Sequence, residues 1–187
     1  MLVLPGERTS RRGLLAAAGG LTTAALAGLA GCGSSTPRTP TNPEFRTADA
    51  EVLDGLLVIE NRGVAVYAHA ASLLRGPEAD LARRIGAQEA SHVYALTGAI
   101  YRLGGTPTPK PATYAFSAAD GRAALALAGA IEDTAIAACI DAVANLTDLQ
   151  ARGTVVGVAN SDAQHAVLIA QARGLPPLSA AIVRGRA

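Results

Sequence analysis

Residues 85–96 read IGAQEASHVYAL, and this stretch places Glu89 and His92 in the middle of an apolar helical pattern. The apolar residues around it recur at spacings of three and four, which predicts a helix over residues 77–103. Residues three positions apart lie on one face of a helix, so both polar side chains share the apolar face. A carboxylate on a buried face needs partners, because burying an unpaired charge is costly.

A second stretch repeats this arrangement near the end of the chain. Residues 158–169 read VANSDAQHAVLI, so Asp162 and His165 have the same spacing on a predicted helix over residues 148–173. Polar residues flanked by an apolar stripe at the same helical level are expected to face the same core.

Each of these pairs follows a single acid in the middle of an earlier apolar stripe. Glu60 precedes Glu89 by 29 residues, and Glu132 precedes Asp162 by 30. The stripes predict helices over residues 48–75 and 118–146. The sequence therefore contains two copies of one helical hairpin, which we expect to pack about a pseudo-twofold axis with matching side chains facing each other.

The predicted helix ends carry ordinary capping and stop signals. We expect N-caps at Thr47, Ser117 (with Asp120 completing a capping box) and Thr147, and stops at Gly76-Pro77, Gly104 and Gly174.

The connection between the second and third helices is unusually long. It spans the fourteen residues 104–117, whereas the other two connections are very short. Fourteen extended residues reach roughly 46 Å, and a helix of about 28 residues is roughly 42 Å long. The segment can therefore cross the whole length of the bundle. This predicts an all-α four-helix bundle in which two antiparallel hairpins are joined by one crossover.

The overall composition agrees with helices and excludes several classes of protein. The 187 residues are 50% hydrophobic but only 3% aromatic, which suits closely packed helices better than a β-sandwich. The formal net charge is +1, so we expect no nucleic-acid partner. Two cysteines cannot make a disulfide framework.

The N-terminal residues have the pattern of an export signal. Arg11 and Arg12 precede a short apolar run over residues 13–30, and the pair resembles a twin-arginine signal. Leu29-Ala30-Gly31-Cys32 resembles a bacterial lipobox, in which Cys32 carries the lipid. An ordinary secretory signal with a chance cysteine is the alternative.

We therefore expect a signal peptide at residues 1–31 and a lipid anchor with a linker at residues 32–46. The domain would occupy residues 47–187. The expected location is the outer face of the cytoplasmic membrane, with membrane attachment through the lipid on Cys32.

The six mid-helix polar residues pose an electrostatic problem. Four carboxylates cannot share a dry core as isolated ions, and the inward positions of the stripes carry no Lys or Arg. The acids must be protonated, bonded to water, salt-bridged or bound to cations. Two divalent cations would neutralise them, with two imidazoles completing the ligand shells.

The order of these residues resembles the di-iron carboxylate signature of the ferritin-like superfamily. It reads Glu60, Glu89-x-x-His92, Glu132, Asp162-x-x-His165, and the resemblance covers residues 47–173. The chain is similar to small exported bacterial ferritin-like-domain proteins. The resemblance implies two iron ions, or manganese, bridged by Glu89 and Asp162 and bound by the other four residues. It also implies ferroxidase or another oxygen- or peroxide-linked redox activity.

One position departs from the family pattern, because Asp162 stands where a Glu is usual. The loss of a methylene shortens the reach of the carboxylate by about 1.5 Å. Either the fourth helix sits closer, or the second metal is held more weakly, or the site is degenerate. The alternative function is a non-catalytic helical module in the cell envelope with a vestigial metal site. A homodimer is compatible with either interpretation, and no protein partner is named by the sequence.

Four other residues near the predicted site carry side chains that could bind a metal ion or a ligand carboxylate. We expect His69 to be a partly exposed helix residue and Cys139 to be a buried, inert thiol. Tyr67 and Tyr94 lie near the site, where a hydroxyl could bond a metal-ligand carboxylate, and packing is the favoured role of each.

Overall fold

Four helices make up most of residues 42–177, the part of the chain that this computed structural model describes. Helix α1 spans Pro43–Leu73, α2 Gly76–Arg102, α3 Gly121–Asn145 and α4 Leu149–Ala172, and these described residues contain no strand. The predicted all-α four-helix bundle is confirmed. The predicted signal peptide and Cys32 lie outside the described residues, as does the end of the chain from residue 178.

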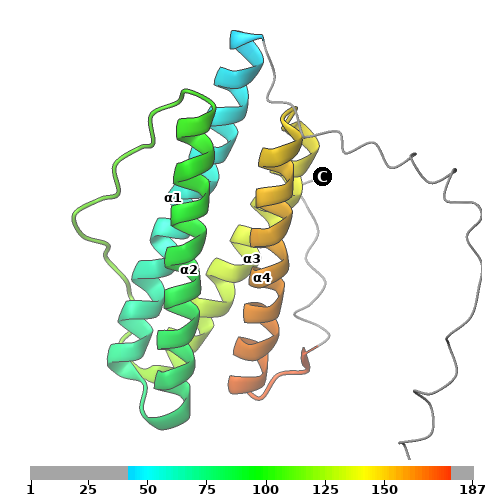
Figure 1. Cartoon of the computed structure of the whole chain (residues 1–187). Helices are drawn as coiled ribbons and strands as arrows, with labels where there is room; N and C mark the ends of the chain where they lie inside the picture. Colours follow the sequence, from blue (N-terminus) through cyan, green and yellow to red (C-terminus); the bar gives the residue numbers. More distant parts are fainter. Residues whose placement is uncertain (1–41, 178–187) are drawn as a thin grey trace, which may run out of the picture. The chain divides into compact units, whose positions relative to one another are not determined.

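The helices form two antiparallel hairpins, α1 with α2 and α3 with α4 (Figure 1). The segment between α2 and α3 runs along the outside of the first hairpin and starts α3 at the opposite end of the bundle. Asp54 on α1 holds this crossover by accepting hydrogen bonds from the Thr108 amide at 2.7 Å and hydroxyl at 2.6 Å. The long connection is therefore a crossover, as its length predicts.

The helix starts differ from the predicted caps. Helix α1 begins four residues before Thr47, where the Asn42 side chain accepts from the Glu44 amide at 3.0 Å and Pro43 occupies the first turn. An Asn cap followed by Pro is a stronger start signal than a single Thr, because Pro needs no amide donor there. The last residues of the predicted linker, Pro43 to Arg46, are thus helical.

Aspartates, not the predicted Ser and Thr residues, also cap the second hairpin. Asp120 caps α3 by accepting from the Ala123 amide at 2.8 Å, and Asp148 caps α4 by accepting from the Ala151 amide at 2.7 Å. A charged carboxylate interacts more favourably with the positive end of the helix dipole than a hydroxyl does. The predicted caps at Ser117 and Thr147 are wrong by three residues and one residue.

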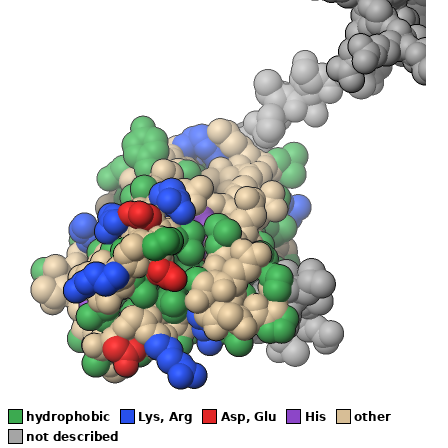
Figure 2. Space-filling model, turned by 90° about the horizontal axis from the view of Figure 1, so that it is seen from below, with side chains coloured by type: hydrophobic (Ala, Val, Ile, Leu, Met, Phe, Trp, Pro, Cys, Tyr) green, Lys and Arg blue, Asp and Glu red, His purple; other side chains and the backbone are tan. Residues whose placement is uncertain are grey.

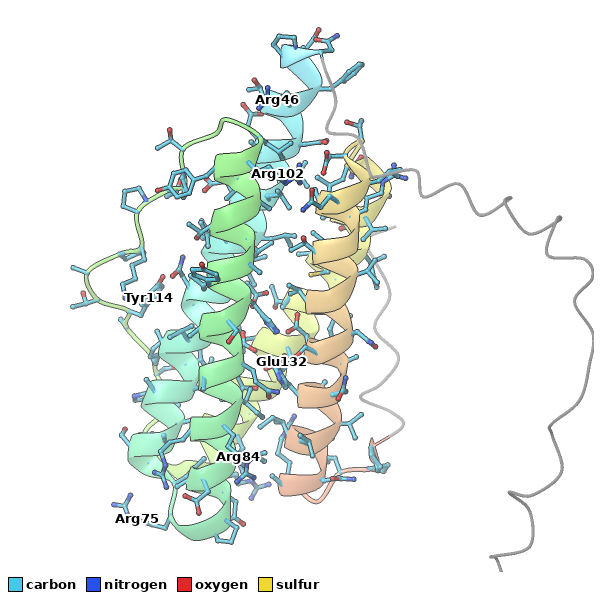
Figure 3. The ribbon with its side chains drawn as sticks, in the orientation of Figure 1. Arg46, Arg75, Arg84, Arg102, Tyr114 and Glu132 are labelled. Carbon is cyan, nitrogen blue, oxygen red and sulfur yellow. The ribbon has the colours of Figure 1, made fainter. Side chains whose placement is uncertain are left out.

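Buried polar residues tie the α3–α4 turn to α1. Asp49 on α1 is fully enclosed and accepts from the Thr147 amide and hydroxyl, both at 2.9 Å, and from the Asp148 amide at 2.7 Å. Arg102 pairs with Asp148 at 2.7 Å and lies near Arg46 at this end of the bundle (Figure 3). These bonds satisfy buried backbone donors at the turn between the last two helices.

Two hydrophobic clusters fill the bundle, one toward each end. The first includes Leu53, Leu57, Leu96, Leu146 and Val155, and the second includes Val66, Tyr67, Ile85, Leu125 and Ile169. Glu132, labelled in Figure 3, lies near the middle of the bundle. A polar layer therefore separates two apolar halves.

Helix α3 is apolar enough, by length and composition, to cross a membrane. Half of its most apolar window is buried inside the bundle, and Glu132 lies in the interior on this helix. In this structure α3 is a core helix. The end of the bundle where α1 meets α2 presents Arg, acidic and hydrophobic side chains side by side (Figure 2).

Candidate metal centre

The six predicted ligands come together from all four helices. Glu60 lies on α1, Glu89 and His92 on α2, Glu132 on α3, and Asp162 and His165 on α4. His92 is 9% exposed and each of the others is at most 3% exposed. The structure thus brings all six residues together in the interior of the bundle.

Their ligand atoms form two overlapping groups of four. One group contains Glu60, Glu89, His92 and Asp162, and the other contains Glu89, Glu132, Asp162 and His165. Within each group the ligand atoms all lie within 4.8 Å of one another. Glu89 and Asp162 belong to both groups, so each can bridge two adjacent cations.

Each imidazole faces carboxylates from other helices. His92 Nδ1 lies 3.1 Å from Glu60 Oε2 and 3.3 Å from Asp162 Oδ1. His165 Nδ1 lies 3.0 Å from Glu89 Oε1 and 3.6 Å from Glu132 Oε2. These separations place a nitrogen and oxygens around a common point in each half, as ligands of one ion require.

The short side chain of Asp162 still reaches the cluster. Its Oδ1 lies 3.3 Å from His92 Nδ1 and 3.8 Å from His165 Nδ1, and the residue has no exposed surface. The shorter side chain of Asp162 therefore still brings its carboxylate into both ligand groups.

The cluster lacks donors for many of its acceptors. Among the described residues, several buried ligand atoms have no hydrogen-bond partner: Glu60 Oε1, Glu89 Oε1, Glu132 Oε2, both Asp162 oxygens and His165 Nδ1. Buried polar atoms are almost always paired, so this concentration of lone pairs fits a site for cations. Four carboxylates with two imidazoles suit iron or manganese better than a metal that prefers thiolates.

Gln88 orients one of the two imidazoles. Its Oε1 lies 2.9 Å from His165 Nε2, and Ser161 Oγ lies 3.3 Å from the same nitrogen. An Nε2–H that donates to Gln88 leaves Nδ1 with its lone pair toward the carboxylates, the arrangement typical of metal-bound histidine. The sequence did not predict this contact of Gln88, although the residue directly precedes the ligand Glu89 on the same helix.

Tyr67 does more than pack. It is fully buried, and its hydroxyl donates a hydrogen bond to Glu132 Oε1. Burial and the neighbouring charge of Glu132 raise the pKa of Tyr67 far above its usual value, so the hydroxyl keeps its proton and remains a donor. Of the two roles considered for Tyr67 from the sequence, a bond to a ligand carboxylate is present in addition to packing. Tyr67 lies seven residues after Glu60 on the same apolar stripe.

The other three candidates lie outside the ligand groups. Tyr94 is 83% exposed, and His69 Nε2 lies 2.9 Å from the Ala118 carbonyl oxygen on the crossover side. Cys139 is buried as predicted, and burial with the nearby Asp162 charge raises the pKa of its thiol, so it stays protonated. None of the three is a ligand in either group.

Crowding and burial favour protonated acids in the cluster. Burial, together with the charge of Glu89, raises the pKa of Glu60 to about 9. Burial and the charges of Glu60 and Glu132 raise the pKa of Asp162 to about 9, and burial also raises the pKa of Glu132. Cations bound here would therefore replace protons.

The pKa of His165 is raised although burial by itself would lower it. Burial alone would lower the pKa of His165, but the neighbouring carboxylates of Glu132 and Glu89 outweigh burial and raise the pKa to about 9. The cluster can therefore hold both protonated carboxyls and an imidazolium when it contains no cation.

Fold and site together define a four-helix carboxylate bundle whose buried cluster can hold metal ions. The sequence model of the ferritin-like domain family matches residues 48–175. The chain belongs to the ferritin-like domain family.

Solved structures share this fold. A conserved hypothetical protein from Mycobacterium tuberculosis superposes with a TM-score of 0.65 at 18% identity, covering 68% of this chain and 91% of that one. A ferritin-like, diiron-carboxylate protein from Bacillus anthracis str. Ames superposes with a TM-score of 0.60 at 21% identity, covering 72% of this chain and 99% of that one. A hypothetical protein from Methanococcus jannaschii superposes with a TM-score of 0.59 at 16% identity, covering 75% of this chain and 86% of that one. A search of curated protein sequences finds no match.

Proposed function

We propose that the chain binds a di-metal centre, with iron as the metal and manganese as the alternative. The observation that carries this proposal is the pair of four-residue groups that share Glu89 and Asp162. In it, Glu60 and His92 complete the ligands of one ion, and Glu132 and His165 complete those of the other. The diiron-carboxylate description of the Bacillus anthracis structure supports iron as the metal.

Such a centre would supply ferroxidase or other oxygen- or peroxide-linked redox chemistry. The chain's own residues prepare the site for it. Tyr67 holds Glu132 by a hydrogen bond, and Gln88 fixes the tautomer of His165. The two hydrophobic clusters exclude water from above and below the polar layer.

Access to the site is expected at His92. Its side chain is 11% exposed, whereas that of His165 is 2% exposed. Ions and small oxidants would therefore enter beside His92, and the His165 side would stay closed under Gln88.

Metal loading tests the proposal directly. The full chain, freed of metal and then exposed to ferrous ion without air, should retain two ions per chain after gel filtration. Admission of air should then oxidise the bound ferrous ion faster than the same ion in buffer. Exchange of exposed Glu51 for Gln provides a control that should bind and oxidise iron as the wild type does. Retention of no metal would favour the non-catalytic module with a vestigial site, and two ions without faster oxidation would favour a binding role.

We further propose export and attachment to the outer face of the cytoplasmic membrane through a lipid on Cys32. The lipobox-like sequence before Cys32 and the Arg11-Arg12 pair support this location. One acyl anchor gives weak binding and the two chains of a diacylglycerol give stable binding. Cys32→Ser should therefore move the protein from the membrane fraction to the soluble fraction, and Arg11→Lys with Arg12→Lys should stop export. A Cys32→Ser protein that stays in the membrane after a carbonate wash would disprove the lipid anchor.

A further inference from the structure

A glycine on α1 makes room for one of the two shared carboxylates. Gly63 is buried, and a Cβ added there would lie 2.6 Å from Glu89 Oε2 and 3.4 Å from Glu89 Cδ. A separation of 2.6 Å is shorter than any ordinary contact between carbon and oxygen. The Glu89 carboxylate can therefore occupy its present position only if residue 63 has no side chain.

The second hairpin carries a different pair of residues at the equivalent positions. Gly63 follows Glu60 by three residues, and Ala135 follows Glu132 by three. In the same repeat Asp162 is the counterpart of Glu89. Ala135 is 3% exposed and Asp162 is not exposed, so both face the packed interior.

The two pairs contain the same number of side-chain carbons, distributed differently. In the first hairpin Gly63 has no methyl group, and the carboxylate of Glu89 is on the longer side chain. In the second hairpin the equivalent position, 135, is an alanine with a methyl group, and the carboxylate of Asp162 is on the shorter side chain. Protein interiors are close-packed, so one methylene added to a filled site must displace something.

We propose that Gly63 and Ala135 determine the length of the bridging carboxylate that each half of the centre accepts. Gly63 is matched to Glu89, and Ala135 is matched to Asp162. Asp162 is then a fitted ligand rather than a sign of degeneration. This inference rests on the proposed di-metal function, and it makes Gly63 and Ala135 positioning residues that act through the carboxylates.

The steric match predicts that a longer side chain at position 162 weakens metal binding. In Asp162→Glu the extra methylene would press the carboxylate against the methyl of Ala135 and move its oxygens away from the ions. Ala135→Gly in the same chain would restore the space. In the first hairpin, Gly63→Ala would displace the Glu89 carboxylate, and Glu89→Asp would withdraw it from the new methyl.

Two double-mutant cycles on the full chain test the match, with manganese as the probe. Titration gives the affinity, and electron paramagnetic resonance reports whether two manganese ions are coupled through a bridge. Asp162→Glu and Gly63→Ala should each weaken binding by roughly tenfold or more and diminish the coupled signal, since close pairs commonly interact at this level. Asp162→Glu with Ala135→Gly, and Gly63→Ala with Glu89→Asp, should each recover most of the affinity and the coupled signal.

Another glycine on α1 supplies a matched control. A Cβ at Gly55 meets nothing within 4 Å, so Gly55→Ala should leave manganese affinity unchanged. Circular dichroism establishes that each variant is folded, and the displaced atoms of Glu89 belong to a flexible side chain that can shift without unfolding the bundle.

The inference and the proposed function fail in different ways. If wild-type protein binds manganese, but Asp162→Glu binds as tightly or the two changes in each cycle simply add, the steric match is overturned and the di-metal function stands. If the wild type binds neither manganese nor iron, the proposed function is overturned and the inference falls with it.

Discussion

The metal-free protein should become more stable as the pH is lowered from 9 toward 5. The pKa values of Glu60 and Asp162 rise to about 9 in the folded chain from ordinary values of 4.5 and 3.8. At a pH between the ordinary and the folded pKa values, the folded state holds protons that the unfolded state has released. Raising the pH in this range therefore favours unfolding. His165 acts in the same direction between pH 6.5 and 9, because its folded pKa is also raised.

The expected slope is steep for a domain of this size. For each proton held only by the folded state, raising the pH by one unit lowers the free energy of unfolding by about 1.4 kcal/mol, so the two carboxyls set a slope of up to about 2.8 kcal/mol per pH unit. Below about pH 4 both states hold these protons and the carboxyl contribution becomes constant. Urea unfolding of the full chain in a metal chelator, followed by circular dichroism from pH 4 to 9, measures this dependence.

A single substitution separates this cluster from other titrating groups. Glu60→Gln removes one raised carboxyl and should reduce the slope by up to about 1.4 kcal/mol per pH unit. Exchange of exposed Glu51 for Gln should leave the slope unchanged. Stability that is constant or rises with pH between 5 and 9 would show that the folded cluster does not retain its protons.

The helical pattern alone was sufficient to predict the bundle and its polar layer. Apolar spacing of three and four residues is repeated over many turns in each helix, so it identifies the inward face reliably. Glu60, Glu89, Glu132 and Asp162 stand out because they interrupt that face. The structure adds that Glu89 and Asp162 each belong to two ligand groups, as the family resemblance implies.

The helix starts could not be predicted as well, because several polar residues compete for each cap. Asn42, Asp120 and Asp148 cap the helices in place of Thr47, Ser117 and Thr147, and at Thr147 a contact across the fold contributes to the difference. Thr147, for example, donates its hydroxyl and amide to Asp49, a residue 98 positions earlier in the sequence. No local pattern in the sequence signals that contact.

The same reason explains the residues that surround the ligands. Gln88 belongs to no motif in the sequence, and the packing of different helices brings it to His165, as it brings Tyr67 to Glu132. The role of Gly63 also requires the structure, because glycine within a helix ordinarily signals weak helix propensity and not space for a carboxylate. Such partners across the bundle depend on rotation and separation of the helices, which periodicity does not specify.

Glu89→Gln should abolish most of the stabilisation that metal confers. A ligand that binds only the folded state stabilises it by RT ln(1 + [L]/Kd), about 2.7 kcal/mol at a hundredfold excess over Kd and about 4.1 kcal/mol at a thousandfold excess. Glu89 belongs to both ligand groups, so its loss weakens both ions. The melting temperature of the wild type should rise on addition of manganese, and that of Glu89→Gln should hardly change.

Without metal, Glu89→Gln should not lower the stability of the protein relative to the wild type and should tend to raise it. The charge of Glu89 contributes to the raised pKa values of Glu60, Glu132 and Asp162, which means that these carboxylates repel one another in the buried cluster. A neutral amide of nearly the same shape removes one source of repulsion, so metal-free Glu89→Gln should be at least as stable as the metal-free wild type. Thermal unfolding of both proteins, each with chelator and with excess manganese, supplies the four values required. If the melting temperature of the wild type does not change on addition of manganese, iron or zinc, the metal centre is ruled out. A buried site that binds an ion tightly must stabilise the fold that forms it.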